Sequence, residues 1–75
     1  MKSADELLEE LGYKKIEENL SIYALCKYKK DDDNIIRFDK DFEIHNTGEY
    51  SESYYGITMQ ELKAINKKCE ELGWL

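Results

Sequence analysis

The strongest constraint on this chain is a pair of matching helix endings that bracket a proline-free, alternating stretch. The letters EELGY run from Glu9 to Tyr13, and EELGW runs from Glu70 to Trp74. In each copy the glycine supplies the left-handed residue that ends a helix, and the aromatic residue after it folds back over the last turn in a Schellman motif. The residues around the two copies differ (SADELL, LKAINKKC), so the repeated sequence indicates two helix ends and not a duplicated site.

Each helix also has a start signal. Ser3 followed by Glu6 predicts a capping box, in which the hydroxyl and the carboxylate satisfy each other's free backbone amides. Thr58 followed by Glu61 repeats the pattern. Apolar residues recur every three or four positions between each box and its stop, which predicts a helix of about two turns and a longer one. So short a first helix is unstable alone and must dock on other elements.

The segment between the helices predicts antiparallel strands. SIYALCKYK, NIIRFDKD and DFEIHN alternate with a period of two, and YKKIEEN adds a short leading strand. KKDDDN at 29–34 predicts the first hairpin connection, and KD at 40–41 the next turn. Residues 49–56 are either an edge strand or a loop that leads into the last helix.

These elements predict one α+β domain over residues 1–75, because a chain this short builds a single lean core. A short N-terminal helix and a longer C-terminal helix pack on one face of an antiparallel sheet of three to four strands. The predicted core is apolar and draws on both helices and the sheet: Leu7, Leu8, Leu11, Ile16, Ile22, Ala24, Cys26, Ile36, Phe38, Phe42, Ile44, Met59, Leu62, Ile65, Cys69, Leu72 and Trp74.

Composition narrows the function classes. The chain is 41% hydrophobic and 37% charged, which is typical of a folded domain. Its net charge of −6 disfavours binding to nucleic acid through a broad basic face. Double-stranded-RNA-binding domains share the element order, but this chain lacks their lysine cluster and has no proline. Two cysteines, no signal peptide and no membrane-length apolar run predict a cytoplasmic protein without membrane contact.

The sequence offers no metal or cofactor motif. The acidic run at 31–33, with Asp39 and Asp41 nearby, has the charge of a calcium loop. Ile35 and Ile36 stand where an EF-hand needs ligands or its glycine, so the run is interpreted as a solvated hairpin turn. The isolated glycines form no phosphate-binding loop. We therefore expect no cofactor.

Among possible catalytic groups, a cysteine–histidine pair is the best candidate, but the sequence gives it little support. Cys26 and Cys69 fall on inward faces, where free cysteines act as small apolar residues, while His45 is predicted to face outward. The expectation is a protein without enzymatic activity.

The candidate interaction surface is aromatic. Tyr50, Tyr54 and Tyr55 lie together in the chain, and tyrosine is favoured at protein interfaces because it combines a rigid apolar body with a polar tip. Exposed tyrosines are also ordinary on small sheets. The lysines of the last helix are interpreted as a mixed solvated face, with Lys67 and Glu71 as an i,i+4 pair.

The pieces LLEELGYKKIEEN, IIRFD and ELKAINKKCEELGWL resemble a group of small uncharacterised proteins encoded by phages and prophages of Gram-positive bacteria. The most recognisable parts are LGY, the FDK at 38–40 and the AIN at 64–66, followed by ELGW. The resemblance spans nearly the whole chain. It implies a phage-related origin and an intracellular location, and it carries no activity or catalytic residue.

Three functional hypotheses follow. The leading one is a non-enzymatic protein-interaction factor of phage or prophage origin, with a host or phage protein as its partner. The second is an acidic mimic that blocks a host nucleic-acid-binding protein, which needs carboxylates clustered on one face. The third is a small enzyme that uses His45 with a cysteine. Exposed sheet edges allow a homodimer, unless charged residues such as Lys27 and Arg37 keep the chain monomeric.

Overall fold

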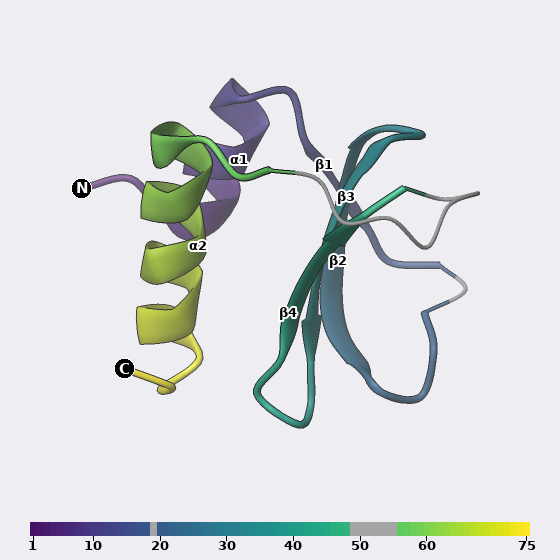
Figure 1. The fold of residues 1–75 in the computed structure, drawn as a ribbon. Coiled ribbons are helices and arrows are strands. Elements are labelled where there is room, and N and C mark those ends of the chain that lie inside the picture. Colours follow the sequence, from purple (N-terminus) through teal and green to yellow (C-terminus); the bar gives the residue numbers. More distant parts are fainter. Residues whose placement is uncertain (19, 49–55) are drawn as a thin grey trace.

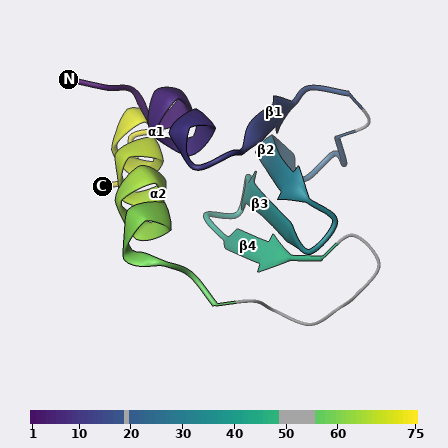
Figure 2. The ribbon, with the colours of Figure 1, turned by 90° about the horizontal axis from the view of Figure 1, so that it is seen from above.

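The computed structural model describes residues 1–18, 20–48 and 56–75. The elements follow in the order α1 (Ala4–Glu10), β1 (Lys14–Ile16), β2 (Ala24–Asp31), β3 (Asn34–Asp39), β4 (Ile44–Thr47) and α2 (Met59–Glu71). The strands form one antiparallel sheet in the order β1-β2-β3-β4. Both helices lie beside each other on the same side of the sheet (Figures 1 and 2), which confirms the α+β architecture.

The helix boundaries are those that the sequence predicts. Ser3 and Thr58 accept hydrogen bonds from the amides of Glu6 and Glu61, whose carboxylates bond the cap amides in return. Gly12 and Gly73 have φ angles of 97° and 78°. The amides after them bond back to the last turns, Tyr13 N–H to Leu8 O at 3.0 Å and Trp74 N–H to Cys69 O at 2.8 Å. Both Schellman motifs are therefore present.

The core lies between the helix pair and the sheet. Its largest fully buried side chains are Tyr13, Tyr28, Phe38, Leu8 and Ile36. The rings of Tyr28 and Phe38 meet edge to face at 6.0 Å. Other predicted core residues are buried or half-buried around them: Leu7, Leu11, Ile16, Ala24, Cys26, Ile44, Ile65, Cys69, Leu72 and Trp74.

Two predicted core residues of the sheet are exposed instead. Ile22 is 76% exposed because β2 begins only at Ala24, so Ile22 lies in the turn before the strand. Phe42 is 72% exposed and adopts a positive φ of 67°, because it completes the turn between β3 and β4. Its ring still packs on Trp74, with ring centroids 5.3 Å apart. The turn is thus one residue longer than the 40–41 turn that the sequence predicts.

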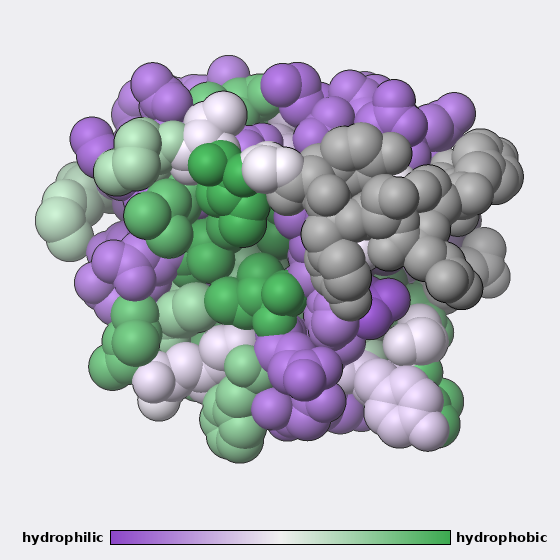
Figure 3. Space-filling model, viewed as in Figure 1, coloured by the Kyte–Doolittle hydropathy of each residue, from purple (hydrophilic) through white to green (hydrophobic). Residues whose placement is uncertain are grey.

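Two predicted core residues of α2 are also exposed. Met59 is 67% exposed and Leu62 is 47% exposed, whereas Glu61 and Ala64 are buried. The buried stripe of α2 is rotated because Glu61 takes an inward position. On the face seen in Figure 3, hydrophobic residues accordingly gather over α2 and beside it.

The strand register separates the side chains of the sheet into two faces. Cys26 pairs with Phe38 and contributes to the core, on the helix side. Lys27 pairs with Arg37, and Arg37 pairs with His45, so these three form a row on the opposite face. The alternation of a strand fixes this separation.

The predicted hairpin connection at 29–34 and the undecided segment 49–56 differ in outcome. The predicted hairpin is present, but its connection is only residues 32–33 and not 29–34, because β2 extends to Asp31 and β3 starts at Asn34. The segment 49–56 falls almost entirely outside the described residues, apart from Gly56.

Candidate functional site

The structure separates the components of the predicted cysteine–histidine pair. Cys26 and Cys69 are both free and buried on the helix side of the sheet, and burial raises the pKa of each thiol. His45 lies in the row with Arg37 on the other face. The imidazole therefore has no route to either thiol, and a nucleophile–base pair between them is not assembled.

The predicted tyrosine surface is not placed by the structure. Tyr50, Tyr54 and Tyr55 all lie outside the described residues. Their part in an interaction stays a prediction from sequence.

The carboxylates of the described residues do not gather on one face. Acidic residues lie on α1, on the tip between β2 and β3, on the turn between β3 and β4, and on α2. Several of them are paired with lysines, such as Glu10 with Lys2 and Asp32 with Lys29. The described part of the chain thus lacks the single acidic face that mimicry of a nucleic acid needs.

A group of titratable side chains connects α1, β2 and α2. The Asp5 carboxylate accepts a hydrogen bond from the Tyr28 hydroxyl, and Lys68 and Lys15 lie 3.5 and 3.7 Å from it. Burial, together with the bond to Asp5, raises the pKa of Tyr28 far above its usual value. A phenol in this state remains a neutral donor at ordinary pH. The hydrogen bond and ion pairs of this group hold α1 and α2 on the sheet.

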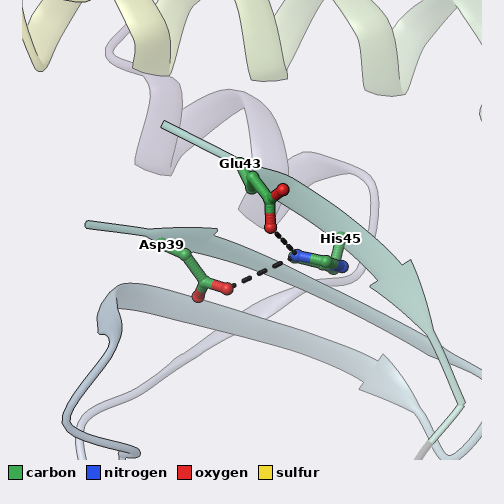
Figure 4. A group of neighbouring side chains, drawn as sticks. All are labelled: Asp39, Glu43 and His45. Atoms are coloured by element: carbon green, nitrogen blue, oxygen red, sulfur yellow. Dashed lines mark hydrogen bonds and ion pairs between the residues drawn. The ribbon is translucent and has the colours of Figure 1, made fainter. Parts of the chain in front are cut away.

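A second cluster lies on the face of the sheet away from the helices (Figure 4). The imidazole Nε2 of His45 is 3.2 Å from a carboxylate oxygen of Glu43 and 3.4 Å from Oδ2 of Asp39. One donor atom from each residue lies within 4.8 Å of the others. Asp39 is 4% exposed, and Glu43 is exposed to solvent. These are the residues of the described chain that are able to hold a metal ion.

The turn between β3 and β4 creates this cluster. The amide of Asp39 donates to the carbonyl of Glu43 at 2.8 Å, and the amide of Phe42 donates to the carbonyl of Asp39 at 3.1 Å. These bonds close a turn of three residues that ends in the left-handed Phe42. Asp39 and Glu43 therefore stand opposite each other, and His45 follows two residues later on the same face.

Arg37 holds the buried member of the cluster. Its Nε donates to Oδ1 of Asp39 at 2.7 Å, and its second guanidinium nitrogen donates to Oδ2 at 3.0 Å. This two-bond contact fixes the carboxylate in one orientation.

The sequence does not predict the cluster, because Asp39 also lies close in sequence to the acidic run at 31–33 and is interpreted with it. The only signal is the D-x-x-x-E-x-H spacing of residues 39 to 45 across a turn.

A groove runs along the outside of the helix pair. Two cavities of about 410 and 160 Å³ adjoin it, and both are lined by Leu7 of α1 and Lys63 of α2. Leu11 adds apolar surface to the smaller one. Leu7 and Leu11 also pack against the core. The groove therefore has an apolar floor that is continuous with the interior of the domain.

The rim of the groove is charged. Lys2 is bonded to Glu10, and Lys67 lies 4.0 Å from Glu70. Among the described residues, no hydrogen bond or ion pair involves the side chain of Lys63. Lys63 thus contributes an uncompensated positive charge beside the apolar floor.

The predicted i,i+4 pair of Lys67 with Glu71 is wrong, because each residue pairs with a neighbour three positions away instead. Lys67 lies near Glu70, whereas Glu71 is paired with Lys68 at 4.0 Å.

Comparisons with protein-family models, with curated proteins and with solved structures found no match to this chain. In the part of the chain that the structure describes, neither helix has the length and apolar character needed to cross a membrane.

Proposed function

We propose that this protein is a small non-enzymatic protein-binding module of phage or prophage origin that acts in the cytoplasm. The groove between α1 and α2 carries the proposal, because it joins an apolar floor at Leu7 and Leu11 to the cation of Lys63, which has no ion-pair partner among the described residues. An apolar patch rimmed by polar groups marks an interaction site in small soluble proteins. The resemblance of LGY, FDK and ELGW to phage proteins supports the origin.

The chemistry of the groove selects its partner. An apolar side chain fits the floor, and a carboxylate beside it meets Lys63. An amphipathic helix that carries leucines on one face and glutamates at their flanks presents both groups at helical spacing. The partner segment is therefore an acidic amphipathic helix, and the protein binds it in a helix-in-groove mode.

A designed peptide tests this directly. A labelled amphipathic peptide with leucine anchors and flanking glutamates is titrated into the ¹⁵N-labelled protein, and amide shifts are followed by NMR. Shifts are expected at Leu7, Leu11 and Lys63. Lys63→Glu should weaken binding by about tenfold, because it replaces attraction by repulsion at the rim. Lys40→Glu is the matched control, since Lys40 is exposed on the turn between β3 and β4.

Two results would overturn the proposal. One is an absence of shift changes in the groove at millimolar peptide. The other is equal affinity of the wild type and Lys63→Glu for the peptide. A peptide in which lysines replace the glutamates should bind more weakly to the wild type and more tightly to Lys63→Glu.

A further inference from the structure

We propose that Asp39, Glu43 and His45 form a binding site for a first-row divalent cation, with zinc as the best fit. The site lies on the face of the sheet away from the helices and is independent of the groove proposed above. All three proposed ligands come from this chain.

Two of the three distances between the donor atoms already match the spacing that a tetrahedral metal imposes. Zinc lies about 2.0–2.2 Å from nitrogen and oxygen ligands, so two ligands of a tetrahedral ion are roughly 3.3–3.5 Å apart. The distances from His45 Nε2 to the carboxylate oxygens of Glu43 (3.2 Å) and Asp39 (3.4 Å) agree with this separation between ligands. The third distance, between the carboxylate oxygens of Asp39 and Glu43, is at most 4.8 Å. A small rotation of the exposed Glu43 side chain brings its carboxylate oxygen closer to that of Asp39.

Arg37 is compatible with a bound metal. A carboxylate oxygen has two lone pairs, and the contact with Arg37 occupies one on each oxygen of Asp39. Oδ2 keeps a lone pair on the side where His45 lies. Metal-binding carboxylates are commonly oriented by such a hydrogen bond. The two carboxylates and one guanidinium sum to one negative charge, which a divalent cation reverses.

The ligands are held by a turn that is itself anchored. Phe42 occupies a left-handed conformation that disfavours residues with side chains, and it packs on Trp74 at 5.3 Å. The contact with Trp74 stabilises the turn, and the turn sets Asp39 opposite Glu43. Asp39 is also almost fully buried, so its rotamer is fixed before any metal binds.

The donor set selects the metal. One imidazole and two carboxylates favour zinc over calcium, magnesium or manganese, because an imidazole ligand suits zinc and the later first-row metals. Three protein ligands leave a fourth position for water. The side chains of His45 and Glu43 are 22% and 60% exposed, which gives the ion a path from solvent.

Metal titration of the full chain tests the site. Isothermal calorimetry with Zn²⁺ should give one site per chain. Co²⁺ in place of Zn²⁺ should give the intense visible bands of a tetrahedral ion. Glu43→Gln and His45→Gln should each weaken Zn²⁺ binding by about tenfold or more, because each removes a ligand. Asp41→Asn is the matched control, since it removes an exposed acid from the same turn and should leave the affinity unchanged.

The alternatives are distinguishable. Binding that is equal in the wild type and in Glu43→Gln would place the metal elsewhere, for example at the buried thiols, and would overturn the proposal. An absence of heat and of visible bands at millimolar metal would do the same. Circular dichroism checks that each variant folds, and if His45→Gln does not fold, Glu43→Gln decides alone, because that side chain is exposed.

Discussion

The hydroxyl of Tyr13 donates a 2.5 Å hydrogen bond to the carboxylate of Glu61, although 48 positions separate them in the chain. Tyr13 follows the glycine that ends α1, and Glu61 closes the capping box that starts α2. Both are buried. The end of one helix and the start of the other are therefore joined in the core by a single charged hydrogen bond.

Loss of this bond should destabilise the fold. Tyr13→Phe keeps the ring and removes the donor, so among the described residues Glu61 keeps its hydrogen bonds with Thr58 alone. Hydrogen bonds to charged groups contribute about 1.5–3 kcal/mol, so the free energy of unfolding should fall by about 2 kcal/mol in urea denaturation. Tyr23→Phe is the control, because Tyr23 is 68% exposed and should change stability by no more than about 0.5 kcal/mol. Equal effects of the two variants would contradict the prediction.

Stability should fall at acid pH because of the same carboxylate. Burial opposes the ionisation of Glu61, but hydrogen bonds from Thr58 and Tyr13 outweigh it and lower its pKa. The unfolded glutamate, with a pKa of about 4.3, then binds protons at a pH where the folded one does not. The stabilisation is present above that value and is lost as the pH falls toward the lower folded pKa.

Urea denaturation between pH 6 and pH 3 measures this loss. Glu61→Gln keeps the capping box and should show a shallower dependence on pH than the wild type. Glu9→Gln, on the exposed face of α1, should retain the wild-type slope. Equal slopes for Glu61→Gln and the wild type would show that Glu61 is not responsible.

The helices were predictable because their signals are local. The capping boxes and the glycine stops each involve residues within one turn, so Ser3, Thr58, Gly12 and Gly73 determine the boundaries before any tertiary contact forms. Which side of a helix is buried is not local. Leu62 is apolar, but the bond between Glu61 and Tyr13 rotates α2 toward Glu61.

The candidate metal site depends on the length of one turn, which the alternation of a strand does not specify. A turn of residues 40–41 pairs Asp39 with Phe42, whereas the observed turn sets Asp39 opposite Glu43. A shift of one residue moves each side chain of a strand to the other face. Phe42 is the additional residue of the observed turn. The sequence does not predict it there, because residues with side chains are uncommon at left-handed positions and because Trp74, on which Phe42 packs, is distant in the sequence.

The two glycines that end the helices should resist substitution. Gly12→Ala and Gly73→Ala should each destabilise the protein by about 1 kcal/mol, because alanine is strained at positive φ. Space is not the cause: a methyl group at position 12 reaches only ordinary contact with Lys30 at 3.6 Å, and at position 73 it meets nothing within 4 Å. Gly56→Ala is the control, since Gly56 has open space and no positive φ. Thermal denaturation of the three variants separates backbone strain from crowding.

The two thiols should be unreactive in the folded protein. Cys26 and Cys69 are buried, and burial raises the pKa of both, so little thiolate forms at pH 8. Their reaction with Ellman's reagent should be at least about tenfold slower in buffer than in 6 M guanidinium. Rapid native labelling of either cysteine would mean that the helix layer opens readily from the sheet.

Stability should also fall at alkaline pH, with Tyr28 as the main cause. Burial and then the bond to Asp5 raise the pKa of Tyr28, and burial and the bond to Glu61 raise that of Tyr13. An unfolded tyrosine ionises near pH 10, so above that pH the unfolded state loses protons that the folded state keeps. The stabilisation is complete below about pH 10 and declines as the pH rises further. Tyr28→Phe should flatten this decline in urea denaturation from pH 8 to pH 11, whereas Tyr23→Phe should keep the wild-type slope. Because lysines titrate in the same range in all three proteins, the difference between the two variants isolates the phenol, and equal slopes would exclude Tyr28 as the cause.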